Sequence, residues 1–167
     1  MNRRYLVFGT IAVVAILGIA LGVSPSNEAD AESGLDVPLT YFDGRQGNLD
    51  DFLGTPVVVN FFASWCPPCV AELPDFAQVE MLRGDEVVFI GVNTSELDPD
   101  AALALAERSG VQYRLVADTD GSIFRRFGGQ AMPTTVFIGA DGRVFEKHEG
   151  ALLARSLMTL IDEHLTS

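Results

Sequence analysis

The residues most able to do chemistry are the only two cysteines of the chain, which lie in the run Trp65-Cys66-Pro67-Pro68-Cys69. They follow a β-branched and aromatic run that predicts a buried strand, and they open a segment with helical character. Free backbone N–H groups and the helix dipole at such a position favour thiolate over thiol. We therefore predict that Cys66 attacks a disulfide and that Cys69 resolves the mixed disulfide.

The two prolines between the cysteines limit this activation. Pro67 and Pro68 each remove one backbone N–H from the start of the helix. The Cys69 N–H then remains as the main backbone donor near a Cys66 thiolate. We expect a moderately acidified Cys66 and a disulfide that is a weaker oxidant than one in a donor-rich setting.

Two other interpretations of the cysteine pair stay open. A static disulfide is common in exported proteins, although the strand-to-helix placement argues against it. A thiolate metal site needs further ligands, and the only histidines are His148 and His164. We expect both histidines at surface or edge positions, and we predict no metal site and no cofactor beyond the disulfide itself.

The N-terminus carries an uncharged apolar run of 19 residues, from Tyr5 to Val23. At about 1.5 Å per residue it can span nearly all of a bilayer core about 30 Å thick. Arg3 and Arg4 before it, and acidic residues after it, place the N-terminus in the cytoplasm and the rest outside. We predict a single-pass signal anchor at residues 1–23.

A cleaved signal peptide is the alternative to the anchor, because residues 29–31 have the small-x-small form of a cleavage site. Cleavage would make the protein secreted, and either interpretation exports the domain. A twin-arginine export signal is a third interpretation, which the residues around Arg3-Arg4 match poorly.

The rest of the chain predicts a polar tether at residues 24–34 and one domain at residues 35–167. Lysine and arginine number 11 against 23 acidic residues, for a net charge of −12, which argues against nucleic acid as a partner. The acidity also predicts that the domain stands off an anionic membrane surface. Nothing in the pattern demands more than a monomer.

Strand and helix signals alternate along the domain and predict an α/β fold with a mixed sheet. Strands are expected at residues 37–42, 56–62, 87–92, near 115, and at 134–138 and 143–147. Helical segments are expected at residues 49–54, 66–83, 99–109 and 122–127, and from Leu153 to Leu165.

The segment from Val57 to Pro74 resembles the active-site segment of membrane-anchored thioredoxin-like proteins of the TlpA/ResA type. Their pattern is Trp-Cys-x-Pro-Cys followed by x-x-Glu-x-Pro, and Met132-Pro133-Thr134-Thr135 is similar to their second signature, a cis-proline loop before a strand. The resemblance covers residues 35–165. It implies a thioredoxin-like fold with an N-terminal β-hairpin extension, and thiol-disulfide oxidoreductase activity.

The resemblance also implies a role for Glu72, which matches the family's acidic residue beneath the active site. A carboxylate in a poorly solvated place can take the proton that Cys69 must lose. The alternative is a surface glutamate in the first helical turns. Asn60 stands where thioredoxin itself usually has aspartate, and because an amide cannot exchange protons in that way, we interpret Asn60 as a core hydrogen-bonding residue.

Three residues are expected to contact substrate. Pro133 resembles the family's cis-proline, which would expose the Met132 backbone for pairing with an extended substrate segment. The alternative is an ordinary trans proline at the start of a strand. Trp65 resembles the residue that shields the nucleophilic sulfur, and plain packing is its alternative.

The expected function is reduction of disulfides in exported proteins, with a disulfide-forming oxidase as the alternative. TlpA/ResA-like proteins often reduce apocytochrome c before haem attachment, using electrons from a membrane thiol-reductase. A thiol peroxidase is disfavoured because residues 62–65 lack the polar setting of a peroxidatic cysteine. A copper chaperone of the Sco type is disfavoured because it needs three residues between its cysteines and a histidine where residues 128–132 have none.

Overall fold

The computed structural model describes residues 35–165 of the chain. The expected anchor and the tether at residues 24–34 lie outside the described residues. Within residues 35–165, no helix combines the length and the apolar character needed to cross a bilayer.

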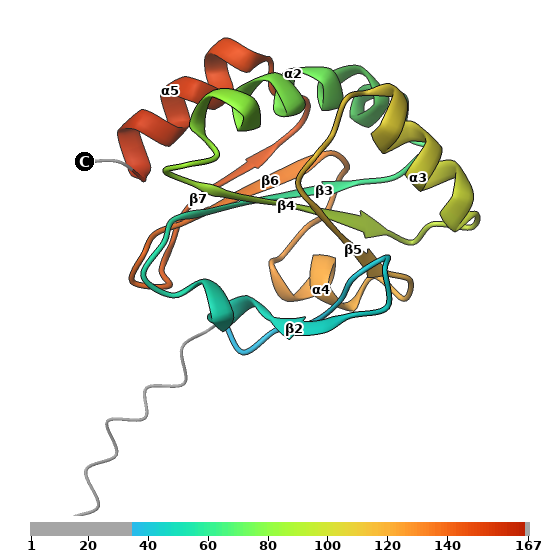
Figure 1. The fold of residues 1–167 in the computed structure, drawn as a ribbon, viewed down its shortest axis with the longest axis horizontal. Coiled ribbons are helices and arrows are strands. Elements are labelled where there is room, and N and C mark those ends of the chain that lie inside the picture. Colours follow the sequence, from blue (N-terminus) through green and yellow to red (C-terminus); the bar gives the residue numbers. More distant parts are fainter. Residues whose placement is uncertain (1–34, 166–167) are drawn as a thin grey trace, which may run out of the picture. The chain divides into compact units, whose positions relative to one another are not determined.

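A five-stranded mixed sheet forms the middle layer of the domain, in the order β5-β4-β3-β6-β7 (Figure 1). The central strand β3 (Val57–Phe62) runs parallel to β4 (Val88–Thr94), which in turn pairs in parallel with β5 (Arg114–Asp118). On its other side β3 pairs antiparallel with β6 (Thr134–Ile138), and β6 pairs antiparallel with β7 (Val144–Glu149). The predicted α/β fold with a mixed sheet is confirmed.

Helices cover both faces of this sheet, as Figure 1 shows. One face carries α2 (Pro67–Arg83), α3 (Pro99–Arg108) and α5 (Ala154–His164). The opposite face carries the short α4 (Ser122–Arg126) and the N-terminal hairpin.

The N-terminal hairpin pairs β1 (Pro38–Thr40) antiparallel with β2 (Gln46–Asn48). A single 3₁₀ turn, η1 (Leu49–Phe52), follows, and the Asn48 side chain caps it. The chain is tied to the edge of the sheet by a bridge between Tyr41 and Val116 of β5.

All six residues of β3 are buried, because other parts of the chain cover both faces of this central strand. Because side chains alternate along a strand, Val58, Asn60 and Phe62 share one face. Val58 packs with the buried residues of α2 and α5, and Phe62 packs with the two cysteines. The polar Asn60 is thereby directed under the start of α2.

Strand β4 extends beyond the prediction, which ended it at Val92. Asn93 and Thr94 are polar, but they are buried and pair with Ala117 and Asp118 of β5. The ladder with β5 continues the strand past the last apolar residue, a tertiary effect that apolar periodicity does not show.

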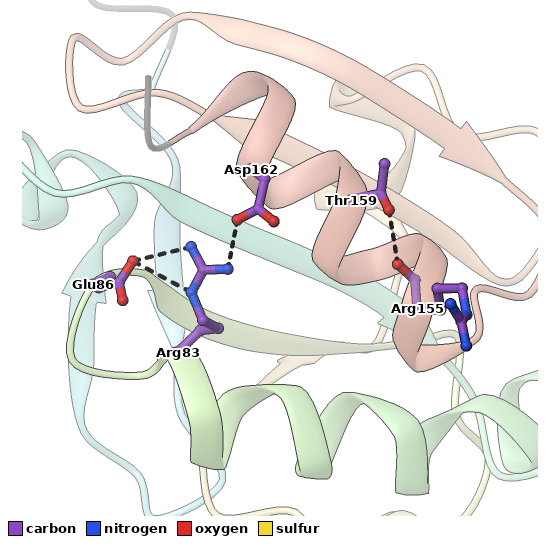
Figure 2. A network of polar contacts seen from close by, with 5 residues as sticks. All are labelled: Arg83, Glu86, Arg155, Thr159 and Asp162. Atoms are coloured by element: carbon purple, nitrogen blue, oxygen red, sulfur yellow. Dashed lines mark hydrogen bonds and ion pairs between the residues drawn. The ribbon is translucent and has the colours of Figure 1, made fainter.

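An ion-pair network fixes α5 against the end of α2, as Figure 2 shows. Arg83 Nη1 lies 2.6 Å from Asp162 Oδ1, and Arg83 Nη2 lies 2.9 Å from Glu86 Oε2. Beneath it, Val79 of α2 and Leu157 of α5 belong to one buried cluster. At the other end of the two helices, the segment that enters α5 is held beside α2 by the Leu152 N–H, which donates to Glu72 Oε2.

Candidate active site

Cys66 and Cys69 form a disulfide at the start of α2, with their Cα atoms 5.3 Å apart. Cys66 is 4% exposed and Cys69 is fully buried. Cys69 is the less exposed of the two, and Cys66 is more covered than a helix start alone predicts. The reason is that the closed pair packs into a cluster with Phe62, Leu73 and Met132.

The hydrogen-bond donors around the Cys66 sulfur follow from the two prolines. Cys66 is the N-cap of α2, and Pro67 and Pro68 occupy the first helical positions without an N–H to donate. The Cys69 N–H lies 3.3 Å from Cys66 Sγ. The geometry therefore has the donor that the sequence indicates at this position.

Glu72 lies one helical turn beyond Cys69 on the same side of α2. Its side chain enters the core, since the residue is only 1% exposed, and the alternative of a surface glutamate is wrong. Asn60 Nδ2 of β3 donates to Glu72 Oε1 at 2.8 Å, and the Leu152 N–H donates to Glu72 Oε2 at 2.9 Å. Strand, helix and the segment before α5 thus meet at one carboxyl group.

The surroundings of Glu72 favour its neutral form more than water does. Burial raises the pKa of Glu72 to about 7, against the lowering effect of the hydrogen bonds from Leu152 and Asn60, and the nearby charge of Asp75 adds to the rise. A carboxyl group with this pKa has both protonation states populated at neutral pH. Such a group can accept and return a proton beside a buried thiol.

Asn60 lies in the core, 1% exposed, and forms hydrogen bonds there as expected. Besides Glu72, its Nδ2 contacts Thr135 Oγ1 at 3.3 Å, across the β3–β6 pair that sets Asn60 opposite Thr135. Asn60 Oδ1 has no hydrogen-bond partner among the described residues.

The Met132–Pro133 peptide bond is cis, as the family resemblance implies. Met132 packs against the cluster that contains both cysteines. The Pro133 carbonyl accepts a hydrogen bond from the Gly150 N–H at 2.8 Å. The loop before β6 is thereby placed beside the disulfide.

A second glutamate, which sequence reasoning missed, supports the main chain before Cys66. Glu96 Oε2 accepts the Ser64 N–H at 2.8 Å and Asn93 Nδ2 at 3.3 Å. Burial would raise the pKa of Glu96, but hydrogen bonds from Ser64, Asn93 and Asp98 outweigh it, and the pKa is lowered. A polar run that follows a strand end, as here, was the available signal in the sequence.

Trp65 lies at the exposed rim, with 53% of the residue accessible. Its indole Nε1 donates to the Ser95 carbonyl at 3.2 Å, which links the rim of the active site to the loop after β4. Ser95 has a positive φ of 51°, the left-handed conformation that only some residues adopt readily. Trp65 is therefore held by a hydrogen bond rather than by core packing.

His148 lies in β7, where it pairs with Thr135 of β6, and His164 lies at the end of α5. Within residues 35–165, no three His, Cys, Asp or Glu side chains come together as a set of metal ligands.

Comparison with known proteins places this arrangement in a family. The Redoxin family matches residues 27–159. The chain belongs to the Redoxin family. The thiol-disulfide oxidoreductase ResA of Bacillus subtilis is 28% identical over 179 residues, covering 100% of this chain and 99% of ResA.

Solved structures agree with the assignment. MTB dsbF, solved in its mixed oxidised and reduced forms, is 30% identical with a TM-score of 0.72, over 78% of this chain and 96% of dsbF. A secreted Mycobacterium tuberculosis disulfide oxidoreductase homologous to E. coli DsbE is 26% identical with a TM-score of 0.72, over 80% of this chain and 99% of that one. The fold is thioredoxin-like, and the protein is a thiol-disulfide oxidoreductase of the ResA/DsbE type.

Proposed function

We propose that this Redoxin-family protein is a reductase of disulfides in exported proteins. Residues 1–23 would anchor it in the cytoplasmic membrane, residues 24–34 would be a tether, and residues 35–167 would be the redox domain outside. The observation that supports this direction of electron flow is that, among residues 35–165, the Cys69 N–H is the one backbone donor to the Cys66 sulfur.

The first step is attack of the Cys66 thiolate on a substrate disulfide. A bond forms between Cys66 Sγ and one substrate sulfur, the substrate S–S bond breaks, and the other substrate sulfur leaves as a thiolate. The exposed Trp65 and the Met132 backbone beside the pair would contact the substrate segment in this mixed disulfide.

The second step is resolution by Cys69. Its buried thiol gives its proton to the Glu72 carboxylate and attacks Cys66 Sγ. A Cys66–Cys69 bond forms, the bond between Cys66 Sγ and the substrate sulfur breaks, and that sulfur leaves as a thiolate. Two electrons have then passed to the substrate, and the Cys66–Cys69 disulfide remains. A dithiol donor in the membrane must reduce it for the next cycle.

The way in which the thiolate is stabilised supports the reducing direction. A dithiol oxidoreductase is a strong oxidant when its reduced form is strongly stabilised, chiefly by donors to the nucleophilic thiolate. Pro67 and Pro68 remove two of those donors from the first turn of α2. Apocytochrome c, which carries paired cysteines, is the substrate that we propose from the likeness to ResA.

An extracytoplasmic location is supported by the N-terminal charge pattern and by the similar M. tuberculosis protein, which is a secreted disulfide oxidoreductase. An anchored domain would also meet a membrane electron donor at a raised effective concentration. The acidic residues that give the whole chain its net charge of −12 lie mostly in the domain and would keep it clear of anionic lipid headgroups.

The test of direction is the equilibrium reduction potential of the Cys66–Cys69 pair, measured in glutathione and dithiothreitol buffers. We expect a value near that of thioredoxin, about −270 mV. A value near about −120 mV would make the protein an oxidase that introduces disulfides. Absence of a reversible couple would leave only a structural disulfide.

A further inference from the structure

Asn60 stands between Glu72 and Thr135 with one of its two polar atoms unused. The Nδ2 atom lies 2.8 Å from Glu72 Oε1 and 3.3 Å from Thr135 Oγ1. The Oδ1 atom is buried and has no partner among the described residues. A buried carbonyl oxygen without a hydrogen-bond donor costs free energy. A change in a neighbouring group can therefore make the opposite orientation of this amide the more stable one.

The neighbour that changes is Glu72. An ionised carboxylate only accepts hydrogen bonds, so the amide must turn Nδ2 toward it. A protonated carboxyl group carries an O–H that needs an acceptor, and half a turn of the amide would bring Oδ1 into the place of Nδ2. Thr135 serves both arrangements, since a hydroxyl can accept from Nδ2 or donate to Oδ1.

We infer that the Asn60 amide turns over with the proton of Glu72 and so provides a hydrogen bond to both forms of that carboxyl group. Each orientation leaves one buried amide atom without a hydrogen-bond partner, so the surrounding hydrogen bonds do not fix either orientation. This inference rests on the proposed function of Glu72 and makes Asn60 a positioning residue for its proton exchange.

Ionisable groups surround Glu72, but the side chain that hydrogen-bonds to its carboxyl group is the uncharged Asn60. Asp75 and Glu80 lie on α2 with Glu72, and Tyr113, before β5, has a pKa raised by burial and then by the charges of Glu72 and Glu80. Strands β3 and β6 contribute Asn60 and Thr135, which carry no charge, and β7 places His148 opposite Thr135. No described contact brings a positive side chain to this carboxyl group.

The test follows the Glu72 carboxyl carbon and the Asn60 side-chain amide by NMR in the full-length oxidised protein labelled with ¹³C-glutamate and ¹⁵N-asparagine. The closed disulfide keeps the cysteines from titrating, and Glu72→Gln identifies the signal. We expect the Asn60 side-chain amide signals to change with the same midpoint as Glu72, about 7. Amide signals that stay constant through that midpoint would overturn the inference.

Variants at Asn60 give a second readout. Asn60→Leu removes a charge-assisted hydrogen bond from the ionised form and a weaker one from the neutral form, so the Glu72 midpoint should rise by about one pH unit. Asn60→Asp places two carboxyl groups together and should split the titration into two steps more than about two pH units apart. An unchanged midpoint in both variants would overturn the inference.

The matched control is Asn93→Leu, which removes a buried amide from the adjacent strand β4 without touching Glu72. It should leave the Glu72 midpoint in place, and a shift equal to that of Asn60→Leu would overturn a specific role for Asn60. The proposed function is tested separately, because it fails if Glu72→Gln resolves mixed disulfides at the native rate, whatever the midpoints do.

Discussion

Two glutamates flank the cysteine pair, and their surroundings shift their pKa values in opposite directions. Glu72, beneath the pair, is almost wholly buried and accepts hydrogen bonds from Asn60 and Leu152, and burial raises its pKa to about 7. Glu96, at the rim, is also partly buried, but hydrogen bonds from Ser64 and others lower its pKa in spite of that burial.

The difference lies in the supply of donors relative to the loss of water. Glu96 accepts from the Ser64, Leu97 and Asp98 N–H groups as well as from the Asn93 amide. It therefore stays ionised and can hold the main chain in front of Cys66. Glu72 has fewer donors and less water, which is the condition for a carboxyl group that exchanges a proton near neutral pH.

The largest effect is expected at the two cysteines, whose substitution should stop the reaction with a substrate disulfide at different steps. Cys66→Ser should abolish reaction with a substrate disulfide, because the attacking sulfur is gone. Cys69→Ser should still react but stop at the mixed disulfide, which can be trapped and identified by mass spectrometry. A stable mixed disulfide formed by Cys66→Ser instead would reverse the assignment of the two roles.

The second largest effect is expected in the pH dependence of the free energy of unfolding. The pKa of Glu72 is higher in the folded protein than its ordinary value of 4.5, so folding favours the protonated form. Its contribution is complete below about pH 4.5 and is lost as pH rises to about 7, by about 3 kcal/mol in the free energy of unfolding.

Urea unfolding of the oxidised protein between pH 4 and 8 measures this loss. Glu72→Gln, which stays neutral, should remove most of the decline. A decline of the same size in Glu72→Gln would assign the pH dependence to other groups.

Glu96 should show the opposite sign and a smaller effect. Glu96→Ala leaves the Ser64 N–H without its partner and should cost about 1 to 2 kcal/mol at pH 7. Because the folded pKa of Glu96 is lowered, its contribution is present above the ordinary glutamate pKa and is lost as pH falls through the folded value. Native protein and variant should therefore converge in acid, and a gap that widens there would contradict the comparison.

The smallest effect is expected at the exposed rim. Trp65→Phe removes the hydrogen bond to the Ser95 carbonyl but keeps an aromatic ring, so stability should fall by less than about 1 kcal/mol. The reduction potential should not change, because the donor to Cys66 Sγ remains. A potential shifted by tens of millivolts would show that the rim acts on the sulfur directly.

Much of this arrangement could be read from the sequence, because local signals and tertiary packing agree there. Apart from Asn60, strand β3 is apolar on both faces, and the cysteines follow it closely, so strand, turn and helix start were all expected. The Met132–Pro133 bond was expected from the family resemblance alone.

Other features depend on contacts that no local pattern contains. The partner of Glu72 on its second oxygen, the Leu152 N–H, lies 80 residues away along the chain. The support of Ser64 by Glu96 joins two loops 32 residues apart. The low exposure of Cys66 likewise comes from the surrounding cluster rather than from the helix start.

The reductase cycle depends on transfer of the Cys69 proton to Glu72, and the rate of the resolving step as a function of pH measures this transfer. In the native protein this rate, measured from a preformed mixed disulfide, should rise with pH through about 7 and then level off. In Glu72→Gln it should be about 100-fold slower at pH 7, and its rise should move to the higher pH at which the thiol ionises unaided. Identical profiles for the two proteins would show that Glu72 does not take this proton.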